Sequence, residues 1–335
     1  MSPSLTAHLA HRAAAAGATA FGAAGAASGP VVLARRSGTT VVRSGGVVAK
    51  AHAPDGDPDL LAARLRVAAH PLLHHVLLAP LAGAGPAAPG RGPAPERPLL
   101  DTLPDGRPVS LWPYGAPVDP DAPGAAPWEA AGELVARLHA VPTAALPGPL
   151  PPMRGPANVA RALELMRRGA RRTAAARAVE AAWSTLAARA RGTAPPPRAG
   201  VLCHGDFHLG QLVRHPAPGG PWRLIDVDDL GLGDPAWDLA RPAAWFATGL
   251  LPSAAFGRFL DAYRRAGGPA LPGAAAGAPL DPWPWLDVPA RALTVQLAAR
   301  ALTRATAEGR PPDEVEQALV DACSRIAGSP GGGEP

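Results

Sequence analysis

Lysine is almost missing from this chain of 335 residues, although arginine is abundant. The two residue types together number 32, and Lys50 is the single lysine among them. Arginine therefore serves wherever a positive charge alone is required. A retained lysine indicates a position that needs a compact charge on a slim stem, such as a buried strand position touching phosphate oxygens. The alternative is chance survival at an exposed strand edge.

Cysteine is also scarce, and long apolar runs are missing. Cys203 lies in a short apolar run and Cys323 on the apolar face of the last predicted helix, which predicts buried thiols without a disulfide framework. The sequence contains no run of about 18 apolar residues, so it predicts no membrane span. His8, His11 and Arg12 interrupt the apolar centre that a signal peptide would need. We therefore expect a cytoplasmic protein with no membrane partner.

Aromatic residues make up only 4% of the chain, and charged residues 18%. The net charge is +5, and the arginines are dispersed along the sequence. Dispersed arginines with few aromatics favour a solvated basic surface over a nucleic-acid-binding face. The sequence therefore predicts no nucleic-acid partner, and it does not indicate an oligomeric state.

Hydrophobic patterning divides the chain into a β-rich part and a helical part. Short β-branched segments separated by glycines in residues 31–52 predict an antiparallel meander. Asp57 and Pro58 predict the start of a helix, and residues 74–83 and 108–115 predict further strands. Helical spacing of apolar residues begins at Trp128. The sequence thus predicts an α+β, two-lobed fold with an Ala-rich segment (1–30), a β-rich N-lobe (31–110), a connector (111–127), a helical C-lobe (128–328) and a disordered tail (329–335).

The most varied polar stretch is "VLCHGDFHLGQLV", residues 201–213, and it is followed by the strand-like "WRLID". Asp206 and Gln211 lie in the first segment, and Asp226 ends the second. Two carboxylates and an amide oxygen form the hard-oxygen set that binds Mg²⁺ together with substrate phosphates. A carboxylate that is not bound to metal can accept the proton of an attacking hydroxyl. The mixed histidines and aspartates also permit a second interpretation, a metal-dependent hydrolase.

The segments "HGDFHLGQLV" and "LIDVDDLGLGDPAWDLA" together resemble the paired signature of the aminoglycoside phosphotransferase and choline kinase-like superfamily. The resemblance extends over about residues 31–325. It implies a protein-kinase-like fold and transfer of the γ-phosphoryl group of ATP to a hydroxyl of a small acceptor, such as a sugar, an amino alcohol or an antibiotic. It also implies ATP and Mg²⁺ as cofactors.

The resemblance also assigns roles to individual residues. Asp206 would be the catalytic base, Gln211 and Asp226 would bind Mg²⁺, and Lys50 would hold the α- and β-phosphates. The implied cofactor-binding residues are Ser37, Gly38 and Thr39 in a turn over the phosphates, and Leu111, Trp112 and Tyr114 in the connector that meets adenine. The implied supporting residues are His204, Asp228, Asp234 and Asp238.

The sequence departs from the family pattern in two places. Gln211 stands where most members have asparagine, and this form of the loop resembles the maltokinase branch, which favours a sugar-like acceptor. The predicted helix after Lys50 lacks the usual glutamate and has Arg64 in its middle. These departures leave a catalytically silent nucleotide-binding pseudokinase as an alternative. Residues 157–191 are rich in arginine rather than acidic groups, which favours a neutral or anionic acceptor over a polycationic one.

Overall fold

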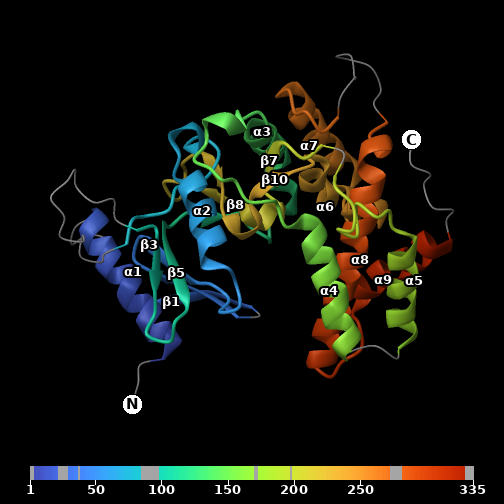
Figure 1. The fold of residues 1–335 in the computed structure, drawn as a ribbon, viewed down its shortest axis with the longest axis horizontal. Helices are drawn as coiled ribbons and strands as arrows, with labels where there is room; N and C mark the ends of the chain where they lie inside the picture. The colour runs from blue at the N-terminus through green and yellow to red at the C-terminus, as the bar shows by residue number, and fades with distance from the viewer. Residues whose placement is uncertain are drawn as a thin grey trace. The chain divides into compact units, whose positions relative to one another are not determined.

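The computed structural model describes residues 4–21, 29–36, 38–83, 98–169, 173–196, 198–271 and 281–328 (Figure 1). The chain forms two compact units. The sheet unit comprises Met1–Asp119, Ala144–Pro151 and Gly210–Asp228, and the helical unit comprises Pro120–Thr143, Pro152–Leu209 and Asp229–Pro335. The predicted α+β class is confirmed, with an antiparallel sheet in the N-terminal region and helices in the C-terminal region.

The sheet unit is built on five strands in the order β1-β2-β3-β5-β4. They are β1 (Val31–Arg36), β2 (Thr39–Ser44), β3 (Val47–Ala51), β4 (Leu100–Thr102) and β5 (Pro108–Pro113). Neighbouring strands are antiparallel, and the predicted meander of β1, β2 and β3 is confirmed. In the register of this sheet, Lys50 on β3 lies opposite Ser110 on β5.

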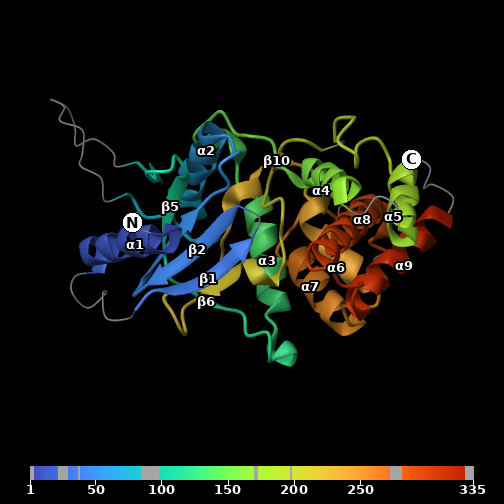
Figure 2. The same ribbon diagram turned by 90° about the horizontal axis from the view of Figure 1, so that it is seen from below.

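One face of this sheet is covered by helix α1 (Leu5–Phe21), as Figures 1 and 2 show. The buried cluster beneath α1 contains Leu9, Ala13, Ala16, Val42, Val47, Ala49, Ala51, Leu103, Val109 and Leu111. Side chains alternate between the two faces of a strand. Because Ala49, Ala51 and Leu111 face α1, Lys50 and Ser110 point to the opposite face. The alternation of the sequence thus determines on which face the lysine lies.

Helix α2 (Pro58–Ala68) begins where the sequence predicts. The carboxylate of Asp57 accepts hydrogen bonds from the amides of Asp59 and Leu60 at 2.9 and 3.1 Å, a cap that contributes about 1 kcal/mol. Residues 74–83 do not form the strand expected there. Only Leu77 and Leu81 make isolated bridges, because Pro80 cannot donate to a ladder.

The sheet unit also holds a smaller three-stranded sheet in the order β6-β8-β9. Its strands are β6 (Ala116–Pro117), β8 (Leu212–Arg214) and β9 (Trp222–Leu224), and β9 confirms the strand expected in "WRLID". The two units differ from the domain boundaries expected from the sequence. Helix α1 packs on the five-stranded sheet, and both Ala144–Pro151 and Gly210–Asp228 belong to the sheet unit.

The helical unit consists of long helices and one short strand pair (Figure 2). The helices are α3 (Trp128–His139), α4 (Gly155–Gly169), α5 (Ala174–Thr185), α6 (Ala236–Ala247), α7 (Ser253–Arg265), α8 (Trp283–Ala307) and α9 (Glu314–Gly328). The strands β7 (Val201–Cys203) and β10 (Gly231–Gly233) pair antiparallel. Helix α3 packs on α7, α4 and α6 pack on α8, and α5 packs on α9.

Short 3-10 turns complete the two units. They are η2 (Pro71–Leu73), η3 (Pro123–Ala125), η4 (Thr143–Ala145), η5 (Leu209–Gln211) and η6 (Val227–Asp229). Cys203 and Cys323 are both buried and free, as the sequence predicts. Within the described ranges, every helix is too short or too polar to cross a membrane.

Candidate active site

The sheet unit brings the single lysine to two carboxylates. The Nζ of Lys50 lies 2.6 Å from Oδ1 of Asp226 and 2.8 Å from Oδ2 of Asp228. Lys50 points from the face of β3 that lies opposite α1, and both aspartates follow β9 in the sequence. The lysine side chain is 11% exposed, which contradicts the alternative of an exposed strand edge.

The mutual attraction of the opposite charges in this cluster keeps Lys50 and Asp228 ionised. Burial lowers the pKa of Lys50, but the charges of Asp226 and Asp228 outweigh burial, so the pKa lies above its ordinary value of 10.5. Burial raises the pKa of Asp228, but the charge of Lys50 and the hydrogen bond from His52 outweigh it, so that pKa lies below 3.8. Lys50 and Asp228 therefore remain an ammonium and a carboxylate near neutral pH.

Asp226 occupies a special backbone position. Its φ is 65°, and it is the only non-glycine residue with positive φ among the described residues. Aspartate tolerates this left-handed conformation better than most residues, but such positions are costly and gather at functional sites. The Nε2 of Gln211, from η5, donates to Oδ2 of Asp226 at 3.4 Å. The two residues that the resemblance assigns to Mg²⁺ are thus neighbours.

A hydrogen-bonded chain that the sequence did not reveal supports this cluster. The Nε1 of Trp112 donates to Oγ of Ser110 at 2.8 Å, and that hydroxyl lies 2.7 Å from Nε2 of His52. The Nδ1 of His52 lies 3.3 Å from Oδ2 of Asp228. Because the carboxylate of Asp228 can only accept, Nδ1 of His52 is the donor to it, and in the neutral ring Nε2 then accepts the hydroxyl proton of Ser110. The alternation of β3 and the register with β5 were the signals that could have revealed His52 and Ser110.

The other residues assigned to the nucleotide lie in different surroundings. Ser37 is outside the described residues, Gly38 forms the turn with φ of 84°, and Thr39 begins β2. The side chain of Leu111 belongs to the cluster under α1, so it points away from the Lys50 face. Tyr114 donates its amide to the carbonyl of Gly46 at 2.8 Å, and its ring lies beneath the guanidinium of Arg43 at 3.5 Å.

In the helical unit, the loop after β7 is held by a buried aspartate. Asp238 on α6 is 0% exposed and accepts the amides of His204 and Gly205 at 2.6 and 2.8 Å. It also accepts Nε2 of His139 at 3.0 Å. Burial raises the pKa of Asp238, but its hydrogen bond and charge interaction with His139 outweigh burial and lower the pKa. The carboxylate thus fixes the backbone that leads to Asp206.

Gly205 is required by this loop. Its φ is 85°, and a Cβ at this position would lie 2.3 Å from the carbonyl oxygen of Asp229. The side chain of Asp229 accepts Nδ2 of Asn158 at 2.9 Å, which fixes it to α4. The positive φ and this close backbone contact therefore strain any residue other than glycine before Asp206.

Asp206 of the first motif and Asp234 of the second motif have different local partners. The carboxylate of Asp206 pairs with the guanidinium of Arg241 on α6. The Oδ1 of Asp234 accepts the amide of Ala236 at 3.1 Å and Nη2 of Arg198 at 2.9 Å. Asp234 therefore caps the start of α6, the structural role that its position before a proline indicates.

A possible metal group lies beside the same loop. The side-chain atoms of His139, Cys203 and Asp238 that could bind a metal lie within 4.8 Å of one another. Among the described residues, this is the cluster of His, Cys, Asp or Glu side chains close enough to share one ion. Nδ1 of His139 lies 2.8 Å from the hydroxyl of Tyr263, which accepts the amide of Ala270. Both nitrogens of His139 and both oxygens of Asp238 are therefore used in hydrogen bonds. The group stabilises the fold, and it does not contain the loop histidines on which the hydrolase interpretation depends.

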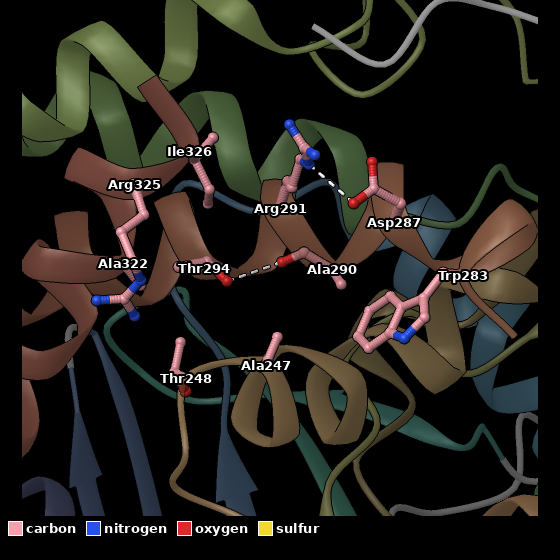
Figure 3. Close-up of a pocket in the computed structure, with 10 residues that line it drawn as sticks. All are labelled: Ala247, Thr248, Trp283, Asp287, Ala290, Arg291, Thr294, Ala322, Arg325 and Ile326. Carbon is pink, nitrogen blue, oxygen red and sulfur yellow. Dashed lines mark hydrogen bonds and ion pairs between the residues drawn. The ribbon is translucent and has the colours of Figure 1, made fainter. Parts of the chain in front are cut away.

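The helical unit contains a cavity of about 170 Å³, and Figure 3 shows the residues that line it. Its walls come from the end of α6, the first half of α8 and the end of α9. Asp287 and Arg291 on α8 form an ion pair at 2.8 Å. The lining residues are Ala247, Thr248, Trp283, Asp287, Ala290, Arg291, Thr294, Ala322, Arg325 and Ile326. The cavity thus combines an apolar floor with two guanidinium groups and one carboxylate.

The fold is similar to that of solved small-molecule kinases. A choline/ethanolamine kinase family protein from Mesorhizobium loti matches with a TM-score of 0.53 and 18% identity, over 94% of this chain and 92% of that one. A thermostable mutant of an aminoglycoside phosphotransferase matches with a TM-score of 0.56 and 14% identity, over 89% of this chain and 94% of that one. An amicoumacin kinase solved with AMP-PNP and Ca²⁺ matches with a TM-score of 0.58 and 13% identity, over 89% of this chain and 88% of that one. The fold class is therefore that of the small-molecule kinases.

The sequence gives the family directly. The model of the phosphotransferase enzyme family matches residues 49–280, more than half of the chain. None of the curated proteins matches the sequence. The chain belongs to the phosphotransferase enzyme family, which confirms the resemblance seen in the two motifs.

Proposed function

We propose that this protein is a kinase that transfers the γ-phosphoryl group of ATP to a hydroxyl of a small acceptor. The observation that supports this most strongly is the position of Lys50 between Asp226 and Asp228. A buried ammonium beside two carboxylates after a strand is the arrangement that holds the phosphates and divalent metal of a nucleotide. The family match and the nucleotide in a similar solved kinase agree with it.

The residues present suit Mg²⁺. Asp226 supplies a carboxylate and Gln211 an amide oxygen, which are the hard oxygen ligands that Mg²⁺ takes together with substrate phosphates. The amide nitrogen of Gln211 faces Asp226, and rotation of the amide would turn its oxygen toward the same space. When bound, the metal would neutralise charge on the phosphate oxygens.

The side chains have separate roles in the transfer. Lys50 binds phosphate oxygens of ATP as a point charge, and His52 orients Asp228 beside it. Asp206 accepts the proton of the acceptor hydroxyl while the oxygen of that hydroxyl bonds to the γ-phosphorus. The bond from that phosphorus to the bridging oxygen breaks, and the electron pair leaves with ADP. Positioning and charge neutralisation supply most of the rate enhancement.

We propose a neutral or anionic acceptor rather than a polycationic one. On α4, Arg161, Arg167 and Arg168 outnumber the single acidic residue Glu164. Arg167 already binds Glu180 through two hydrogen bonds of 2.8 and 2.9 Å. The cavity of Figure 3 is lined by Arg325 and by the ion pair of Arg291 with Asp287. The net charge of α4 and that of the cavity lining are both positive, which disfavours a ligand with several amines.

The test is a coupled ADP-release screen across sugars, amino alcohols, hydroxy acids and antibiotics. With an acceptor found, Asp206→Asn should lower kcat by roughly 10²–10⁴-fold and leave binding of ATP–Mg²⁺ intact in a thermal-shift assay. Asp261→Asn, whose side chain on α7 is 68% exposed, is the matched control and should behave as wild type. Near wild-type turnover of Asp206→Asn would contradict the assignment of the base. A thermal shift with ATP–Mg²⁺ but no ADP release with any acceptor would favour the silent nucleotide-binding protein.

A further inference from the structure

A buried arginine contacts the side chain that we propose as the base. Nη2 of Arg241 donates to Oδ1 of Asp206. The side chain of Arg241 is 9% exposed and that of Asp206 is 22% exposed. The Nε of Arg241 is buried and has no hydrogen-bond partner in the described part of the chain. A guanidinium removed from water in this way requires a counter-charge, and Asp206 supplies it.

Helix α6 contacts the loop before and at Asp206 in two ways. Asp238 and Arg241 are three residues apart on this helix, so they lie on the same face. Asp238 accepts the backbone amides of His204 and Gly205. Arg241 binds the carboxylate of the next residue. The same face of one helix therefore fixes both the backbone of the loop and the direction of its acidic side chain.

We propose that Arg241 is a positioning residue for Asp206. Its guanidinium holds Oδ1, so that Oδ2 is the oxygen that meets the hydroxyl of the acceptor. This inference rests on the proposed function, in which Asp206 accepts the hydroxyl proton. Without the arginine the carboxylate can rotate about its Cβ–Cγ bond, and the oxygen that accepts the proton leaves its reactive position.

Arginine suits this task because its planar guanidinium fixes direction as well as charge. Lysine would supply the charge through a flexible stem without a fixed plane. A purely structural ion pair would behave differently. Its loss would lower the stability of the fold without a specific fall in kcat, whereas loss of a positioning residue also lowers the rate of the bound complex.

The experiment compares Arg241→Met, Arg241→Lys and the control Arg12→Met in steady-state kinetics with saturating acceptor. Arg12 on α1 is also ion-paired, but to Asp101 on β4 at 2.6 Å. We expect kcat of Arg241→Met to fall by about 10²-fold at an unchanged KM for ATP, with partial recovery in Arg241→Lys and wild-type kinetics in the control. Wild-type kcat in Arg241→Met would overturn the proposal. So would a loss of kcat matched by an equal rise in KM and not recovered in Arg241→Lys.

A thermal-unfolding cycle with Asp206→Asn provides a readout that does not require activity. Asp206→Asn alone should lower Tm, because the buried guanidinium loses its counter-charge. Adding Arg241→Met should recover part of that loss. If the two changes lower Tm additively, the ion pair does not exist in solution and the proposal is overturned. If they are coupled but no acceptor is phosphorylated, the proposed function fails, and the positioning role fails with it.

Discussion

The side-chain nitrogen of Lys50 lies 2.6 Å from Oδ1 of Asp226, although 176 residues separate them in the sequence. Asp228 contacts the same nitrogen at 2.8 Å. The only lysine of the chain is thus placed between two carboxylates by the pairing of β3 and β5 and by the loop after β9. This relationship connects the unusual composition of the sequence to the chemistry proposed for it.

Replacing Lys50 tests whether its shape matters as well as its charge. Lys50→Met should lower kcat/KM for ATP by about 10²–10³-fold, because a preorganised positive group is lost from the phosphates. Lys50→Arg should also lose most of the activity, since the planar fork does not fit where a point charge lies. ADP release and the thermal shift with ATP–Mg²⁺ measure both. Arg66→Met, at an exposed position of α2, is the control, and wild-type activity in Lys50→Arg would contradict this role of shape.

His52 and Ser110 should act through Asp228. Ser110→Ala and His52→Ala each break the chain that orients this carboxylate. We expect kcat/KM for ATP–Mg²⁺ to fall roughly 10-fold, the usual effect of removing a group that orients a metal or phosphate ligand. Thr40→Ala, at another buried hydroxyl of the same sheet, controls for general destabilisation. Equal losses in Thr40→Ala and Ser110→Ala would contradict the specific role.

Gly205→Ala should damage the loop before Asp206. The new Cβ would lie 2.3 Å from the carbonyl oxygen of Asp229, at a φ of 85°. We expect the free energy of unfolding to fall by about 1–3 kcal/mol, together with a loss of kcat. Urea denaturation measures the first effect. Gly124→Ala, with nothing within 4 Å of the new carbon, should be nearly neutral, and equal stability of the two variants would contradict the strained geometry.

The stability that α9 contributes to the fold should depend on pH through the ionisation of Glu316. Hydrogen bonds from Arg310 outweigh the opposing effect of burial, and together with Arg304 they lower the pKa of Glu316 from 4.5 to about 2. A pKa lowered by folding gives stability that is present above pH 4.5 and is lost as the pH falls toward 2. The carboxylate of Glu316 also accepts a hydrogen bond from the backbone amide of Asp313 at 2.9 Å. The carboxylate of Asp313 in turn accepts one from the backbone amide of Glu316 at 2.8 Å, which forms a reciprocal cap.

Glu316→Gln should therefore lower the free energy of unfolding by about 1 kcal/mol at pH 7, the usual value of a lost cap. The difference from wild type should shrink as the pH falls from 4.5 toward 2. Urea denaturation of both proteins across this range measures it. A gap that stays constant down to pH 2 would show that the charge of Glu316 does not contribute.

Local patterns in the sequence were sufficient for much of the fold. The glycine-separated strands of the meander, the cap of α2 at Asp57 and the helical spacing from Trp128 were all predicted, because each depends on neighbours within a few residues. The strand expected at residues 74–83 was wrong, because Pro80 and the nearby chain leave only isolated bridges. The face on which Leu111 lies depends on sheet register, and a strand read by itself does not contain that information.

The sequence alone determined the family, the α+β class and the identity of the residues proposed for chemistry, because motifs and hydrophobic periods are properties of the linear chain. Only the tertiary structure decided which groups surround them. It placed His52 beside Asp228, Ser110 beside His52, and Arg241 against Asp206. These partners are distant in sequence, and their contacts depend on strand register and helix packing. Burial then makes each contact matter, because a buried charge or hydroxyl without a partner is costly.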